Sequence, residues 1–584
     1  MAVALLPNAD TFVIVFPIPT MNYRFYPNRP DSVTADFARA EYQTLLAQLA
    51  PAESAELPDQ WTQLFHQWNA LAGYVGGESS RINFRFAGNM ADTALKERER
   101  YFCEEVAPVV TEGRHQFMQA FLESRHADAV AEQLGGHMIP VLRNTMEPLD
   151  PINTTLRLKE GQVANQYSML MAVAEVEFNG KAMSLKELGS FMDSPDPELR
   201  KQAWLAIRGW VGNNRQTLRQ IFAELVELRH QMGLNLGHPN FVPLGYSGMG
   251  RTDYGPAEAA TFRESIRTHA VPLRRRLAAK HAARMGAERM RPWDAPYDPE
   301  LTIPPGSVPV ETQLESAERM FDRISTHLAD HLRRMRAEGL IDLEHRHGKR
   351  AGAFCTWFSD EGRPAIFCNS TGNADDVRTL IHEMGHAIQH WESGSIQNVL
   401  LHSPTADACE IHSLGLEFLT LPFIDEFFTP ENARRFRLGR WRKVVGAMCY
   451  RAQVDEFQHW VYENPTATPA EREDAWARIG TLYDSDLDYS GLEEHLGTSW
   501  YQLPHIFRSP FYYIDYAIAE TAAMQLAIMA EQDHDRAMQT YLQLCRVGGT
   551  MGLLDIVSSA GLRSPFDPEL MKELMEYAAA QVGM

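Results

Sequence analysis

The chain has 584 residues, 45% of them hydrophobic, and carries a formal net charge of −21. This length is sufficient for several domains and for a large core that needs no disulfide support. An acidic surface repels phosphate backbones, so the composition argues against a nucleic-acid-binding protein. No run of 18 apolar residues occurs in the sequence, which argues against a membrane-spanning helix.

The cysteines and the N-terminal residues bear on location. Six cysteines are scattered along the chain without a CxxC pair, which is typical of a reducing compartment. The first 19 residues are apolar in two short pieces, and no Lys or Arg precedes Arg24. The basic start of a secretory signal is therefore missing, and we expect a cytoplasmic protein without a membrane partner.

Helical periodicity dominates the sequence. Apolar residues at three- and four-residue intervals predict helices over 32–50, 197–229, 256–287, 310–337 and 568–581. The proline-rich stretch 291–309 predicts a long loop, and residues 463–468 predict a second break. Two apolar runs between Phe354 and Cys368 flank the turn-rich SDEGRP and predict a hairpin. We expect a mostly α fold of two helical lobes, 1–190 and 191–584, with a small β element.

Residues 382–386 read His-Glu-Met-Gly-His and lie within an amphipathic segment that Asn373 can cap. Four helical residues turn about 400°, so His382 and His386 lie about 40° apart and roughly 6 Å along the axis. Two imidazoles at this spacing can share one tetrahedral Zn²⁺, and Glu383 can reach a metal-bound water without ligating the metal. The motif therefore predicts one zinc ion per chain.

The third ligand must come from elsewhere, because Gln389 and Glu392 occupy the positions where the extended HExxHxxGxxH motif needs Gly and His. Glu410 lies in the middle of a second predicted helix, 403–421, and is the best candidate. Glu417, two turns further on, is placed to orient a ligating His. Asp407 and Glu392 are lesser candidates for the third ligand.

Four further residues near the motif have simpler explanations. Gly385 is unfavourable in a helix interior by about 1 kcal/mol, which suggests that the second predicted helix approaches closely there. His390, His402 and His412 are near the motif in sequence, but ordinary surface or hydrogen-bonded histidines are the simpler interpretation.

A family resemblance follows from these segments. The stretch 352–390, GAFCTWFSDEGRPAIFCNSTGNADDVRTLIHEMGHAIQH, together with the sequence Glu410-Ile-His-Ser413, resembles the oligoendopeptidase F branch of the thimet oligopeptidase family of zinc metallopeptidases. The stretch 505–520, HIFRSPFYYIDYAIAE, is similar to the carboxy-terminal His/Tyr segment of that family. The resemblance is specific over about 350–570 and faint over the first 250 residues.

The resemblance implies a deep channel with zinc at its floor and short unstructured peptides as substrates. It implies hydrogen-bond donors to the reacting carbonyl at His505 and Tyr516. It further implies a second tyrosine at the site beside Tyr516. This tyrosine is either Tyr513, which would act in catalysis, or Tyr512, which would contact the substrate. The resemblance also implies that the strand 364–368 is a sheet edge that binds an extended peptide. The strand's contact residues would then be Ala365, Ile366 and Phe367.

Three functions remain open at this stage. The leading one is a zinc-dependent oligoendopeptidase that uses Glu383 to activate the attacking water. The first alternative is a zinc carboxypeptidase or dipeptidyl carboxypeptidase, which needs a cation such as Arg508 or Arg546 for the terminal carboxylate of its substrate. The second alternative is a non-catalytic helical peptide-binding protein, although the presence of the complete motif argues against it.

Overall fold

The structure is a computed structural model that describes residues 32–484 and 487–584. The first 19 residues, from which we expect no secretory signal, lie outside the described residues. Within the described ranges, no helix combines the length and the apolar character needed to cross a membrane. The predicted mostly α fold with a small β element is confirmed.

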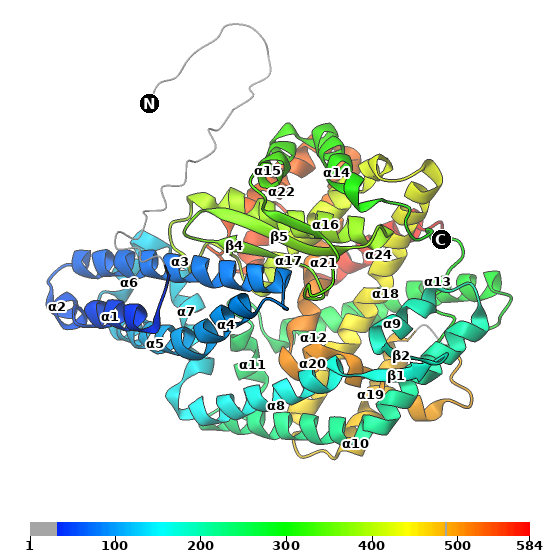
Figure 1. Ribbon diagram of the computed structural model, residues 1–584, viewed down its shortest axis with the longest axis horizontal. Coiled ribbons are helices and arrows are strands. Elements are labelled where there is room, and N and C mark those ends of the chain that lie inside the picture. Colours follow the sequence, from blue (N-terminus) through cyan, green and yellow to red (C-terminus); the bar gives the residue numbers. More distant parts are fainter. Residues whose placement is uncertain (1–31, 485–486) are drawn as a thin grey trace, which may run out of the picture.

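The N-terminal helices gather on one side of the molecule (Figure 1, blue to cyan). They are α1 (Ala35–Leu46), α2 (Leu49–Ser54), α3 (Asp59–Gly88), α4 (Thr93–Tyr101), α5 (Ala107–Glu123), α6 (Ala127–Leu134) and α7 (Met138–Met146). Their core is aromatic: Trp68 of α3 stacks on Phe117 of α5 at 5.8 Å between ring centroids. The buried core of these helices extends from Val33 to Leu142 and also includes Leu401. Val163, which precedes residue 190, already belongs to the main core of the rest of the chain. The division of the chain at residue 190 stays a prediction.

The middle of the chain contributes mostly helices. They are α8 (Thr154–Ala172), α9 (Leu185–Ser190), α10 (Pro197–Asn235), α11 (Val242–Gly248), α12 (Pro256–Ser265), α13 (Val271–Arg284), α14 (Val310–Ile324) and α15 (Thr326–Ala337), with the hairpin β1 (Glu175–Phe178) and β2 (Lys181–Ser184). The helix predicted over 310–337 is two helices, because Ser325 has extended backbone (φ −164°, ψ 121°). Residues 291–309 form turns without a helix or strand, as predicted.

The remaining elements hold most residues of the HEMGH region and of the His/Tyr segment. They are β3 (Ile341–Glu344), β4 (Phe354–Phe358), β5 (Arg363–Ser370), α16 (Ala374–Glu392), α17 (Ala406–Thr420), α18 (Pro430–Glu463), α19 (Pro469–Tyr483), α20 (Pro504–Arg508), α21 (Asp515–Gln532), α22 (His534–Val547), α23 (Leu553–Ser559) and α24 (Pro568–Gln581). The break predicted at 463–468 is confirmed, and α24 has the predicted bounds.

The three-stranded sheet has the order β3-β5-β4, with β3 parallel and β4 antiparallel to β5. Our prediction that 364–368 forms the sheet edge is therefore wrong. The short strand β3, which gave no clear signal in the sequence, pairs with β5 on the side away from β4. Ala365, Ile366 and Phe367 are fully buried in this central strand, and the edge strand on the other side is β4.

Contacts from α3 fix the turn between β4 and β5. Arg81 makes a bidentate ion pair with Asp360, with nitrogen–oxygen distances of 2.6 and 3.0 Å. The hydroxyl of Ser359 donates to the carbonyl of Gly73 at 2.6 Å. The N-terminal helices therefore hold the hairpin in place beside α16.

Candidate metal centre

Helix α16 carries the HEMGH motif beside the three-stranded sheet (Figure 1). Its start is fixed by Asp376, whose carboxylate accepts backbone hydrogen bonds from Thr371, Gly372 and Asn373 at 2.7–2.8 Å. A carboxylate in the first turn also suits the positive end of the helix dipole. The motif therefore lies on a firmly started helix, as the sequence predicts.

Helix α17 crosses α16 at Gly385. A Cβ atom on Gly385 would lie 2.6 Å from both the carbonyl oxygen of His412 and the Cα of Ser413. The predicted close approach of the second helix is confirmed. It brings Glu410, which is buried on α17, next to the two motif histidines.

His382, His386 and Glu410 form a group whose ligand atoms all lie within 4.8 Å of one another. The Nε2 atoms of His382 and His386 lie 3.4 and 3.8 Å from Glu410 Oε2. The two imidazoles are nearly perpendicular, with centroids 5.1 Å apart. Two imidazoles and one carboxylate converging in this way can hold a metal ion and leave a fourth position open.

Glu417 orients His382, since its Oε1 lies 2.8 Å from His382 Nδ1. With Nδ1 engaged, His382 presents Nε2 to Glu410. Burial would lower the pKa of His382, but Glu410 and Glu417 raise it to about 10. The pocket thus favours positive charge at this imidazole, and a bound cation can replace the proton there.

Arg440 in turn holds Glu417, with Arg440 Nε 2.9 Å from Glu417 Oε2. Burial would raise the pKa of Glu417, but Arg440 and His382 lower it to about 2. Arg440 also pairs with Glu520 of α21 at 2.5 Å. Sequence reasoning missed this buried arginine, because no motif distinguishes it from the other arginines of α18.

Glu383 is buried beside these ligands but is not a member of the metal-binding group. Burial raises the pKa of Glu383 to about 7, against the lowering effects of His382 and of the backbone of Cys355 on the edge strand β4. A carboxyl group with a pKa near neutrality can both accept and return a proton.

The tyrosine segment meets the site through Tyr512, whose hydroxyl donates to Glu410 Oε1 at 3.1 Å. The ring of Tyr516 lies 5.1 Å from that of Tyr512. Burial and the Glu410 carboxylate raise the pKa of both tyrosines, so both stay protonated donors. His505 stacks on Tyr512 at 5.9 Å and has a buried Nδ1 without a hydrogen-bond partner.

Tyr513 lies on the side of Tyr450, with ring centroids 5.9 Å apart. The structure thus brings Tyr512 to the metal ligands, rather than Tyr513. Tyr512 and Tyr513 precede helix α21, which starts at Asp515. Phe511 has left-handed backbone (φ 67°) and separates α20 from the turn that leads into α21.

Two buried side chains fix this unusual backbone. Arg251 donates to the carbonyl of Phe511 at 2.6 Å and pairs with Asp515 at 2.6 Å. The amide of Phe511 donates to Gln458 at 2.9 Å. Sequence reasoning missed Arg251 and Gln458, since they are 260 and 53 residues away from Phe511 along the chain.

The other histidines near the motif lie outside the metal-binding group. His390 and His402 stack on Trp357 at 5.2 and 4.6 Å. His412 hydrogen-bonds the carbonyls of Cys409 and Leu544. The hydrogen bonds of His412 agree with the simpler interpretation. That interpretation is wrong for His402, which is buried and whose two ring nitrogens have no hydrogen-bond partner, so it is held by stacking instead.

The two lesser candidates for the third ligand also lie elsewhere. Asp407 accepts a 2.5 Å hydrogen bond from Thr405 at the start of α17. Glu392 contacts His327 of α15, away from the motif histidines.

Family models place the chain among known proteins. The model described as Peptidase family M3 matches residues 190–576, and the Peptidase M3 N-terminal domain model matches residues 28–147. The chain belongs to Peptidase family M3. The resemblance to its oligoendopeptidase F branch is confirmed by the relatives that follow.

Curated relatives match part of the chain. Oligoendopeptidase F (chromosomal) of Lactococcus lactis subsp. cremoris is 27% identical over 232 residues, 38% of either chain. Oligopeptidase PepF of Bacillus subtilis is 22% identical over 231 residues, 38% of this chain and 33% of that protein. These matches span less than two-fifths of each relative's length.

Solved structures match almost the whole chain. PZ peptidase A with an inhibitor superimposes with a TM-score of 0.87 at 29% identity, covering 96% of this chain and 99% of that one. An X-ray structure described as oligoendopeptidase F gives a TM-score of 0.85 at 30% identity, covering 96% and 98%.

Proposed function

We propose that the protein is a zinc-dependent oligoendopeptidase that hydrolyses short unstructured peptides in the cytoplasm. The observation that carries this proposal is the convergence of His382, His386 and Glu410, with His382 oriented by Glu417. Two imidazoles and one carboxylate, with an open fourth position, are the donor set of a catalytic zinc. When bound, zinc polarises a peptide carbonyl and a water molecule.

The residues of the chain then have separate roles. Glu383 takes a proton from the attacking water and returns it to the leaving amine, for which a pKa of about 7 suits it. Tyr516 and His505 donate hydrogen bonds to the carbonyl oxygen as it gains negative charge. Tyr512 holds Glu410 and can contact the substrate from the same side.

The edge strand β4 is the surface on which we expect an extended peptide to lie, in place of β5. β4 pairs with β5 on one side, and the backbone of its Cys355 is near enough to Glu383 to lower the pKa of that carboxyl group. A peptide that adds to the other side as a further strand would therefore run past the catalytic carboxylate. Only flexible chains can adopt this conformation, since a folded substrate must first unfold at a cost of about 5–15 kcal/mol.

An exopeptidase needs a free cation for the terminal carboxylate of its substrate. Arg546, one of two candidates, is already 2.8 Å from Glu392. This engagement argues against Arg546 in that role and leaves Arg508, which is exposed, as the other candidate. A peptide blocked at both ends discriminates between an exopeptidase and an endopeptidase, because only an endopeptidase cleaves it.

The test is a timed digest of a mixed peptide library, read by mass spectrometry, with and without a chelator. We expect internal cleavage of peptides of about 5–20 residues, a length range that the family resemblance implies for a buried site, and loss of cleavage with chelator. Glu410→Ala should lose both zinc and activity. Full activity of that variant, or rapid digestion of a stable folded protein, would contradict the proposal.

A further inference from the structure

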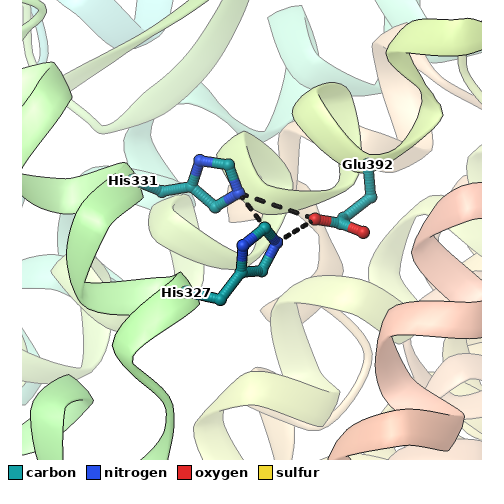
Figure 2. A group of neighbouring side chains, drawn as sticks. All are labelled: His327, His331 and Glu392. Carbon is teal, nitrogen blue, oxygen red and sulfur yellow. Dashed lines mark hydrogen bonds and ion pairs between the residues drawn. The ribbon is translucent and has the colours of Figure 1, made fainter. Parts of the chain in front are cut away.

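A second group of metal-ligand side chains lies at the C-terminal end of α16. His327 and His331 are four residues apart on α15, and Glu392 is the last residue of α16. Figure 2 shows both imidazoles pointing toward the Glu392 carboxylate. His327 Nε2 lies 2.5 Å from Glu392 Oε1, His331 Nε2 lies 3.5 Å from the same oxygen, and the two Nε2 atoms are 3.2 Å apart.

Hydrogen bonds account for only part of this triangle. If both Nε2 atoms carry protons, both donate to Glu392 Oε1, and the 3.2 Å contact between the two nitrogens then joins two donors. If one Nε2 atom lacks a proton, it accepts from the other, and its lone pair faces the Glu392 oxygen. In either case three possible ligand atoms from two helices turn toward one point.

We propose that His327, His331 and Glu392 form a second metal-binding site, suited to Zn²⁺ and similar divalent transition-metal ions. A cation at the centre can accept a lone pair from each of the three atoms, in place of the protons between them. Ligand atoms around tetrahedral zinc are about 3.3–3.6 Å apart, given zinc–ligand distances of about 2.0–2.2 Å. Two of the three observed separations, 3.2 and 3.5 Å, already lie in or close to this range. The third opens by a rotation of His327, whose side chain is 40% exposed.

The surroundings prepare the ligands. Arg546 Nε contacts Glu392 Oε2 at 2.8 Å, which leaves Oε1 for the metal, and Trp391 stacks on His331 at 4.3 Å. Burial lowers the pKa of His331. Burial would raise the pKa of Glu392, but hydrogen bonds with His327 and His331 lower this pKa to about 2. A neutral imidazole and an ionised carboxylate are the forms that bind metal. The positive charge of Arg546 opposes the cation, so we expect weaker binding than at the HEMGH motif.

This site is separate from the candidate metal centre. Glu392 follows His386 by six residues, which is about 9 Å along α16 and about 240° around it. A metal ion held by Glu392 therefore links α15 to the end of α16 and does not reach the HEMGH histidines. We expect it to stabilise the fold without taking part in hydrolysis.

Zinc content measured after equilibrium dialysis against buffered micromolar free Zn²⁺ tests the proposal. The full-length parent should hold one more zinc per chain than His327→Ala, His331→Ala or Glu392→Gln. His66→Ala, at an exposed histidine of α3, should match the parent. His386→Ala should lose the other ion, and His386→Ala/His331→Ala should lose both. Added Zn²⁺ should raise the Tm of His386→Ala but not of the double variant.

Equal zinc content in the parent, His327→Ala and His331→Ala would overturn the second site. His327→Ala keeps the test decisive if His331→Ala fails to fold, because the His327 side chain is partly exposed. Failure of the second site and failure of the proposed function give different results. The catalytic zinc is tested by His386→Ala, independently of what the His327 and His331 variants show.

Discussion

Gly385 of α16 lies so close to His412 of α17 that a Cβ atom at 385 would be 2.6 Å from the His412 carbonyl oxygen. Backbone cannot move aside as a flexible side chain can, so this contact requires glycine. The spacing between the two helices, and with it the distance from the motif histidines to Glu410, depends on it.

Gly385→Ala should therefore destabilise the protein by about 1–3 kcal/mol, as overpacking does, and weaken zinc binding. Gly446→Ala is the matched control, because Gly446 lies within α18 and a Cβ there would meet nothing within 4 Å. That variant should gain up to about 1 kcal/mol from helix propensity. Denaturant unfolding of both checks the difference, and equal stability of the two would contradict the close approach.

Glu417→Gln tests the orientation of His382. The change keeps the size of the side chain but removes the negative charge that lies 2.8 Å from His382 Nδ1. Loss of such a partner typically lowers metal affinity by 10–100-fold. Competition with a chromogenic chelator measures this, and an unchanged affinity of the tighter site would refute the role of Glu417.

Tyr516→Phe isolates the hydroxyl of the proposed carbonyl donor. The ring and its packing stay, so zinc and KM should be close to the parent values. The kcat should fall by about 10²–10³, which is typical for the loss of one donor. Tyr513→Phe is the control, because Tyr513 packs against Tyr450 and not against the metal ligands. This variant should change kcat little. A kcat of Tyr516→Phe within about threefold of the parent would place this tyrosine in the core.

Glu473 predicts a pH dependence of stability. Its buried carboxylate accepts from Tyr501 at 2.8 Å and pairs with Arg215 and Arg219. Burial would raise its pKa, but these partners lower it from 4.5 to about 2. Because the folded-state pKa lies below the unfolded value, Glu473 stabilises the fold above about pH 4.5. This contribution is lost as the pH falls toward 2.

Glu473→Gln should thus cost about 1–3 kcal/mol at pH 7, and the cost should shrink between pH 5 and pH 3. The free energy of unfolding of parent and variant, measured across this range, checks the trend. Glu494→Gln, at an exposed side chain, should show no such trend. A cost that stays constant down to pH 3 would contradict the sign.

Local patterns predicted much of the fold and the site. The spacing of His382 and His386, the position of Glu410 in a helix and the rarity of a helical Gly385 are all visible within one stretch of about 30 residues. Each rests on helical geometry, which depends on near neighbours. The β4–β5 hairpin was visible for the same reason, since it is a local pairing.

Long-range pairing set the limits of prediction. β3 is only four residues long, and its pairing with β5 made the predicted edge strand central. Phe511 takes a left-handed backbone because Arg251, in the loop between α11 and α12, and Gln458 of α18 hold it from distant parts of the chain. The His327–His331 spacing was visible in the sequence, but Glu392 joins it only through packing of α15 against α16.

The central claim is that zinc at the HEMGH motif works with Glu383 as the general base. Turnover of an internally quenched peptide by Glu383→Gln, measured together with zinc content, tests it most directly. The account predicts the zinc content of the parent and a fall in kcat of about 10²–10⁴. A kcat above about a tenth of the parent value, with zinc retained, would contradict it.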